Sequence, residues 1–191
     1  MIVAVIGSGG KTTLIHRTAQ AYLDMGKKVF VTTTTHMYRE EDTLVNPSLQ
    51  EIEDAILEKH YCMAGMIREN GHPEKITALP TEMLCKIDKM VDIMLIEADG
   101  SRQMPLKWPA AYEPVIPECV DEIWLVAGLA GLGGRAEDVV HRYELAGFEP
   151  DHRITEEDLH HLLYDGYIKP LQKKFPQAGI QIFYIKVYLY I

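Results

Sequence analysis

The sequence predicts an α/β fold of three layers around a mainly parallel sheet. Apolar segments of strand length alternate along the 191 residues with segments that have the periodicity of helices. Residues 1–6 are apolar at every position, as in a strand buried on both faces of a parallel sheet. Strands that alternate with helices favour parallel pairing through right-handed crossovers. No repeat or flexible linker interrupts the alternation. We therefore expect one domain over residues 1–191, and the pattern leaves open whether its C-terminal part is complete.

The N-terminal half of the chain predicts strands, helices and a hairpin. In the first helix, Ile15, Ala19 and Tyr22 share one face, and Gly26 marks the end. Asn70-Gly71 is a turn signal between two segments of strand character, so it predicts a small antiparallel hairpin insertion. The expected segments are a strand at 1–6, a helix at 11–25, a strand at 28–35, a helix at 47–58 and hairpin strands at 61–68 and 74–79.

The C-terminal half continues the alternation of strands and helices. Thr155-Glu156-Glu157-Asp158 has the form of a capping box and predicts the start of a helix that reaches Tyr164. Many prolines and little periodicity over residues 101–117 indicate an ordered loop. The other expected segments are a short helix at 81–89 capped by Thr81, and strands at 91–97, 122–126 and 180–191.

The acidic composition limits the classes of partner. A net charge of −9 and an isoelectric point near 5.3 disfavour nonspecific binding to nucleic acids or anionic membranes. No segment is long and apolar enough to span a bilayer, and no basic region precedes the first apolar segment as in a signal peptide. Cys62, Cys85 and Cys119 show no CxxC spacing and are expected to be buried thiols. We therefore expect a cytoplasmic protein without nucleic-acid or membrane partners.

A glycine-rich loop joins the first strand to the first helix, in the segment Gly7-Ser8-Gly9-Gly10-Lys11-Thr12-Thr13. Glycines let the backbone turn sharply and bring its N–H groups close to phosphate oxygens, and the helix N-terminus adds unpaired N–H groups. Lys11 would reach the β- and γ-phosphates of a nucleotide, and the Thr12 hydroxyl would bind Mg²⁺. The segment therefore predicts a P-loop that binds ATP or GTP with Mg²⁺, within a P-loop NTPase-like fold. Because Val5 replaces the usual first glycine, the loop resembles the shorter P-loop of Mur ligases.

Two acids follow the apolar strand at 91–96, in the segment Glu97-Ala98-Asp99-Gly100. An acid at the end of such a strand is typical of a Walker B motif, where it binds Mg²⁺ or orients an attacking nucleophile. Glu97 and Asp99 share one side of an extended chain, so both can face the phosphates. Lys11, Glu97 and Asp99 are therefore the predicted catalytic residues, with Thr12 and Glu97 as metal ligands. Asp99 has a second interpretation as a cap of the turn at Gly100.

Further candidates lie where the ligand of a parallel sheet is expected, beyond the carboxyl ends of its strands. Thr34 and Thr35 would bind Mg²⁺, its water or a phosphate, or they reflect only the β-propensity of threonine. His36 would face a substrate or the solvent. The glycine-rich run at 128–134 lacks a following Lys-Thr, so an active-site loop is favoured over a second nucleotide loop.

Cations in the C-terminal half are candidates to bind an anion. Arg102 and Lys107 would clamp an anionic substrate or the γ-phosphate, although composition alone favours two solvated surface cations. Arg142 follows His141 on an expected helix and is a further phosphate candidate.

These segments, taken in order, resemble the YqeC-like proteins, a family of accessory factors of selenium-dependent molybdenum hydroxylases. The resemblance extends from Met1 to about Arg142. It implies a nucleotide-binding protein that helps to mature a selenium- or molybdenum-containing cofactor, with a molybdenum hydroxylase or its maturation factors as partners. The segments that carry it are 7–13, 31–37, 97–102, 105–107, 113–117 and 141–142.

Three functions are compatible with these residues. The first is an NTPase or phosphoryl-transfer factor. The second is an ATP-dependent ligase of the Mur type or a small-molecule kinase, which the short loop supports. The third is a non-catalytic carrier gated by a nucleotide. The Asn-Lys-x-Asp motif with which GTPases read guanine is missing from the last predicted strand, so the choice between ATP and GTP stays open.

Overall fold

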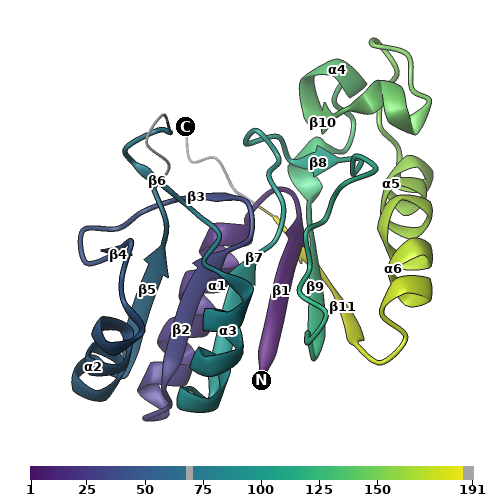
Figure 1. The fold of residues 1–191 in the computed structure, drawn as a ribbon. Helices are drawn as coiled ribbons and strands as arrows, with labels where there is room; N and C mark the ends of the chain where they lie inside the picture. Colours follow the sequence, from purple (N-terminus) through teal and green to yellow (C-terminus); the bar gives the residue numbers. More distant parts are fainter. Residues whose placement is uncertain (68–70, 187–191) are drawn as a thin grey trace.

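A single parallel sheet forms the centre of the molecule (Figure 1). The computed structural model describes residues 1–67 and 71–186. Within these residues, seven strands pair in the order β11-β9-β1-β7-β2-β5-β4, and every neighbouring pair is parallel. The predicted α/β class and the mainly parallel sheet are therefore confirmed. The strands are β1 (Ile2–Gly7), β2 (Val29–Thr33), β4 (Leu44–Val45), β5 (Tyr61–Gly65), β7 (Ile93–Glu97), β9 (Glu122–Gly128) and β11 (Gly179–Ile185).

Helices cover both faces of the sheet. Alternate residues of β1 point to opposite faces, and each face lies in its own buried cluster. Val3 and Val5 pack with Ile15 and Ala19 of α1 (Lys11–Asp24). The opposite face packs against α2 (Leu49–Lys59), α3 (Thr81–Ile87), α5 (Glu156–Leu163) and α6 (Lys169–Lys174). This double coverage explains why β1 is apolar at every position.

The caps of the helices agree only in part with those predicted from the sequence. The Thr155 hydroxyl and the Asp158 carboxylate form the predicted capping box at the start of α5. Ser48 and Glu51 form a second box at α2, which the sequence analysis did not predict. The predicted cap of α3 by Thr81 is wrong, because the capping residue is Pro80 and no side chain caps the helix.

Two small strand pairs lie beyond the carboxyl edge of the main sheet (Figure 1). The strand β3 (His36–Tyr38) pairs with β6 (Lys75–Thr77) in antiparallel orientation, and a Met66–Thr77 bridge extends this contact. The predicted hairpin insertion is thus partly correct: its first arm belongs mainly to β5 in the central sheet. Asn70 of its predicted turn lies outside the described residues.

The second pair is parallel and corrects the sequence analysis at two places. It joins β8 (Leu106–Lys107) to β10 (Val140–His141), so the predicted loop at 101–117 contains a short strand. Arg142 was expected on a helix. It instead follows β10 with a left-handed backbone, just before the 3₁₀ turn η3 (Tyr143–Ala146).

The remaining sequence predictions divide into confirmed and corrected ones. Cys62 is buried as expected, whereas Cys85 and Cys119 are exposed. Their exposure contradicts the expectation of buried thiols, because α3 and the loop before β9 present them at the surface. The last predicted strand is confirmed as β11, and residues 187–191 of that prediction lie outside the described residues. Across the described ranges, none of the helices has the length and apolarity needed to cross a membrane.

Candidate functional site

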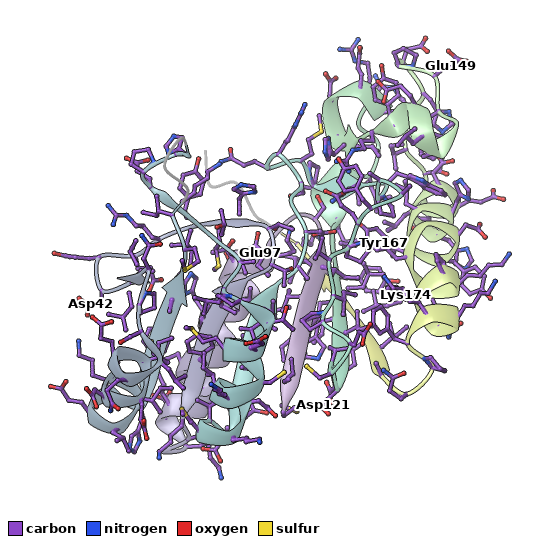
Figure 2. All side chains as sticks on the ribbon, in the orientation of Figure 1. Asp42, Glu97, Asp121, Glu149, Tyr167 and Lys174 are labelled. Atoms are coloured by element: carbon purple, nitrogen blue, oxygen red, sulfur yellow. The ribbon has the colours of Figure 1, made fainter. Side chains whose placement is uncertain are left out.

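The topology of the sheet brings the glycine-rich loop and the two acids together. The strands β1 and β7 are neighbours, with Val5 opposite Glu97 in the parallel register. Parallel strands that share a register also share their carboxyl edge, so the segments that follow β1 and β7 meet there. Glu97 is the last residue of β7, and Figure 2 shows it at the carboxyl edge of the sheet. We refer to residues 7–10 as the glycine loop.

The glycine loop has a backbone shape that only glycine adopts without strain. Gly7, Gly9 and Gly10 have φ angles of 87°, 79° and 129°. A Cβ atom on Gly7 would lie 2.2 Å from the Val126 carbonyl oxygen, and one on Gly9 would lie 2.6 Å from the Cα atom of Gly128. The protein itself therefore fixes this loop, by packing it against the end of β9.

Ser8 anchors the loop to its surroundings. Its backbone N–H donates to the Val126 carbonyl at 2.8 Å. Its hydroxyl donates to the Met104 carbonyl, in the loop that follows the acids. Ser8 is 1% exposed, so its side chain serves the architecture of the loop rather than a ligand in solvent.

Backbone donors without partners gather where the loop enters α1. Gly10 caps this helix without a side-chain hydrogen bond. The first N–H groups of a helix have no acceptor within the helix. Among the described residues, no group accepts a hydrogen bond from the amides of Gly9 to Thr13. These amides, together with the partial positive charge of the helix N-terminus, form a surface suited to an anion.

Lys11 and Thr12 place a cation and a hydroxyl beside these amides. The Lys11 ammonium donates to the Gly7 carbonyl at 2.8 Å and lies 3.4 Å from Asp99 Oδ1. The exposed Thr12 donates its hydroxyl to Glu97 Oε2 at 3.1 Å. Burial raises the pKa of Glu97, and Lys11 and the Thr12 hydrogen bond oppose that rise.

The pair of Thr12 and Glu97 has the chemistry of a partial magnesium site. Mg²⁺ prefers oxygen ligands, and it usually keeps several waters while taking one or two carboxylates and substrate phosphates. In the described part of the chain, no cluster of three or more His, Cys, Asp or Glu side chains could hold a metal. The residues present therefore fit Mg²⁺ only if phosphate and water oxygens complete its coordination.

A partly buried network of ion pairs contacts the glycine loop. Asp99 is fully buried, and its Oδ2 atom accepts the Gly7 N–H at 3.2 Å and lies 3.3 Å from the Lys107 ammonium. Lys107 also contacts Glu113 at 2.6 Å, and Glu113 in turn contacts Arg142 at 2.5 Å. We call Asp99, Lys107, Glu113 and Arg142 the ion network. Ion pairs between exposed side chains contribute little to the free energy of folding. A buried charge, in contrast, destabilises the fold strongly when its partner is removed.

Comparison with known proteins agrees with the resemblance described above. A family model described as "YqeC protein" matches residues 3–144, most of the chain. The chain belongs to the YqeC family. The "Uncharacterized protein YqeC" of Escherichia coli (strain K12) is 33% identical over 174 residues, which cover 83% of this chain and 65% of that protein. The present chain therefore spans about two thirds of the length of this YqeC relative. No solved structure matches.

Within this YqeC chain, the predicted phosphate and metal residues come together. The glycine loop, Lys11, Thr12, Glu97 and Asp99 are linked by the contacts given above. Thr13 is exposed at the start of α1. The catalytic and ligand roles of these residues stay predictions.

The predicted substrate residues are less uniform. The Thr34 hydroxyl donates to the Val115 carbonyl at 2.6 Å, and the Thr35 hydroxyl lies 3.4 Å from that of Thr33. His36 is exposed on β3. Arg102 is exposed, with a left-handed backbone, and forms no ion pair within the described ranges.

Lys107 differs most from the sequence analysis. Composition favoured a solvated cation, but the residue is 3% exposed and its ammonium contacts Gly100, Asp99 and Glu113. The expectation of a surface cation is wrong because the buried Asp99 and the half-buried Glu113 both contact this lysine. The guanidinium of Arg142 is likewise occupied by Glu113, through both of its terminal nitrogens.

Sequence reasoning missed two residues of the site in this YqeC protein. Glu113 was noted only as part of the family pattern, although an acid in the loop after Lys107 is a natural partner for a buried cation. Tyr167 donates its hydroxyl to Asp99 Oδ2 at 3.1 Å and is 1% exposed. No local pattern marks Tyr167, because its partner lies 68 residues earlier in the chain.

Two hollows in the described part of the molecule lie apart from the glycine loop. A mainly apolar one of about 470 Å³ lies between α5 and β11, and one of about 340 Å³ lies between the 108–114 segment and α6. Neither contains Lys11, Glu97 or Asp99 among its lining residues. The candidate site is therefore identified by its polar groups, which are the loop amides, the Lys11 ammonium and the carboxylates of Glu97 and Asp99, rather than by the volume of a hollow.

The ion network gives a testable pH dependence. Burial raises the pKa of Glu113, but the hydrogen bonds from Arg142 and Lys107 outweigh it and hold the pKa below its ordinary 4.5. A carboxylate whose pKa is lower in the folded than in the unfolded state stabilises the fold fully at pH values above the unfolded-state pKa. This stabilisation is lost as the pH falls through the pKa of the folded state.

We expect Glu113→Gln to destabilise the protein by about 1–3 kcal/mol at neutral pH. The difference from the wild type should shrink as the pH falls below about 4. Urea unfolding at a series of pH values measures both quantities. A difference that stays constant from pH 7 to pH 3 would contradict the lowered pKa.

Proposed function

We propose that this YqeC protein binds a nucleoside triphosphate with Mg²⁺ at the glycine loop, which acts as a P-loop in a P-loop NTPase-like fold. The observation that carries the proposal is the row of amides from Gly9 to Thr13, which have no acceptor in the described part of the chain, together with the ammonium of Lys11. An anion-binding helix start, a lysine and an adjacent hydroxyl–carboxylate pair are the parts that triphosphate binding requires. The activity that these parts support best is NTP hydrolysis or phosphoryl transfer.

Each residue has a role that follows from its position. The amides and Lys11 hold the β- and γ-phosphates, since an ammonium has three donors and the Gly7 carbonyl occupies one. Thr12 and Glu97 hold Mg²⁺, which neutralises the developing phosphate charge when it is bound. Asp99 is fully buried among Lys11, Lys107 and the Gly7 amide, so we assign it to fixing the loop rather than to contacting water in solvent.

A second candidate activity is ligation or kinase chemistry on an anionic small molecule. Arg102 and Gln103 have positive φ angles of 49° and 63° in the segment whose Met104 carbonyl accepts from Ser8. Strained backbone persists where the surroundings enforce it, and it gathers at functional sites. Arg102, which forms no ion pair within the described ranges, would hold the carboxylate of an acceptor. Product analysis with labelled ATP and candidate acids separates this activity from hydrolysis.

The biological role follows from the family resemblance. We propose that this cytoplasmic protein couples nucleotide binding to maturation of a selenium-dependent molybdenum hydroxylase, with the hydroxylase or its maturation factors as partners. Co-purification of such a hydroxylase with the full-length protein would support this role. Tight nucleotide binding without turnover would instead favour a nucleotide-gated carrier.

A thermal-shift screen tests the binding proposal directly. A ligand that binds only the folded state raises the apparent stability by mass action. We expect ATP or GTP with Mg²⁺ to raise the melting temperature more than either nucleotide without Mg²⁺, and more than the diphosphates. The absence of a shift with all of these nucleotides at millimolar concentration would refute the assignment.

The metal role of Glu97 makes a separate prediction. Glu97→Gln keeps the shape of the side chain but removes its charge, so Mg²⁺ loses a carboxylate ligand. We expect turnover to fall about a hundredfold and the Mg²⁺ concentration for half-maximal activity to rise, because the electrostatic term is usually large. Glu118→Gln, at an exposed position, is the control. Wild-type hydrolysis and Mg²⁺ dependence in Glu97→Gln would remove this residue from the site.

A further inference from the structure

The carboxylate of Asp99 is held unevenly. Its Oδ2 atom receives the Gly7 N–H and the Tyr167 hydroxyl and lies near the Lys107 ammonium. Its Oδ1 atom is buried without a hydrogen bond among the described residues, and it lies 3.4 Å from the Lys11 ammonium. The donors on one oxygen therefore set the direction in which the other oxygen faces Lys11.

An unusual turn presents Tyr167 to this carboxylate. The π-helical turn η4 (Tyr164–Ile168) joins α5 to α6. Such turns are rare in proteins, and those that occur are often found at functional sites. A Cβ atom on Gly166 would lie 3.2 Å from the Trp108 ring, so the turn packs closely against the segment after β8. Figure 2 shows Tyr167 on the side of the sheet that faces α5 and α6. Its hydroxyl reaches the end of β7 from this layer.

A role in filling the core explains the ring of Tyr167 but not its hydroxyl. Phenylalanine would occupy nearly the same volume without burying a polar group, which costs free energy unless it is hydrogen-bonded. Burial and the neighbouring Asp99 raise the pKa of Tyr167 well above its ordinary value. The phenol therefore stays protonated and donates to Asp99 at every pH near neutrality.

We propose that Tyr167 is a positioning residue of the nucleotide site. Its hydroxyl fixes the Asp99 carboxylate, and the carboxylate fixes the Gly7 amide and the direction of the Lys11 ammonium. The inference rests on the proposed function and adds to the site a residue from outside the family-matched segment 3–144. It also explains the π turn, which places a buried hydroxyl at the base of the glycine loop.

The test compares Tyr167→Phe with Tyr164→Phe, which removes an exposed hydroxyl from the same turn. Binding of ATP and GTP with Mg²⁺ is measured by calorimetry, and hydrogen exchange of the hydrogen-bonded Gly7 and Ser8 amides is measured in the nucleotide-free protein. Hydrogen bonds to charged groups are worth enough that Tyr167→Phe should weaken binding about tenfold. Exchange of the Gly7 and Ser8 amides should become faster, and Tyr164→Phe should change neither quantity.

A double-mutant cycle with Asp99→Asn identifies the path of the effect. If Tyr167 acts through Asp99, the double variant binds nucleotide about as weakly as Asp99→Asn alone. Additive losses would overturn the path, and so would a Tyr167→Phe variant that melts earlier but binds and exchanges as the wild type does. In those cases the proposed function stands, because the wild type still binds nucleotide. A wild type that binds neither nucleotide would overturn both proposals.

Discussion

Lys11→Ala is expected to abolish measurable nucleotide binding while the protein stays folded. The ammonium is the side-chain cation that lies beside the unpartnered amides of the glycine loop, and charge-assisted hydrogen bonds are the strong ones. Its loss should weaken binding at least about a hundredfold. Lys107 remains beside Asp99 in this variant, so the buried carboxylate keeps a cationic partner.

Calorimetry with ATP and GTP in the presence of Mg²⁺ measures this loss. Arg17→Ala removes an exposed cation from the same helix and serves as the control for long-range electrostatic effects. Far-UV circular dichroism shows whether the fold is retained. Equal affinity in Lys11→Ala and the wild type would place the phosphates elsewhere and leave the glycine loop as a structural turn.

Lys107→Met should have the largest effect on stability. Methionine is similar in length and apolar, so it fills the space while removing the charge that separates Asp99 from Glu113. Breaking a buried ion pair by removing one partner typically costs about 3–5 kcal/mol, since the remaining charge is left uncompensated. Lys11 and Arg142 still face the two carboxylates, so we expect the lower end of this range.

Urea unfolding measures the free energy of unfolding of Lys107→Met, and Lys169→Met serves as the control at an exposed lysine. Lys169 is exposed on α6, and its substitution should change the free energy of unfolding by no more than about 0.5 kcal/mol. Equal free energies for the two variants would mean that Lys107 is a solvated cation, as composition alone suggested.

Local sequence patterns were enough for the longer strands of the main sheet, for the main helices α1, α2 and α5, and for selecting the candidate residues of the glycine loop. The apolar residues before Gly7 and before Glu97 specify strands, because strands buried on both faces leave few polar positions. The spacing of Ile15 and Ala19 specifies the face of α1. The glycines and Lys11 could be selected from their residue types and spacing alone, because a glycine-rich turn followed by Lys-Thr between a strand and a helix is typical of a phosphate-binding loop.

Contacts between distant segments were not predictable in the same way. Nothing local in the sequence places β7 between β1 and β2, yet this order puts Glu97 beside Thr12. The burial of Lys107 depends on Asp99 and Glu113 meeting it, and the role of Tyr167 depends on a turn that packs on Trp108. Such contacts are settled by the packing of whole layers, which periodicity does not encode.

The ion network has a consequence for how the molecule loses order. One carboxylate anchors the Gly7 amide and also compensates Lys107, whose other partner Glu113 holds Arg142. We therefore expect the glycine loop and the segment that reaches residue 142 to unfold as one cooperative unit. Warming or acidification should accordingly disorder the proposed nucleotide site and expose the 100–142 region to proteases in one transition.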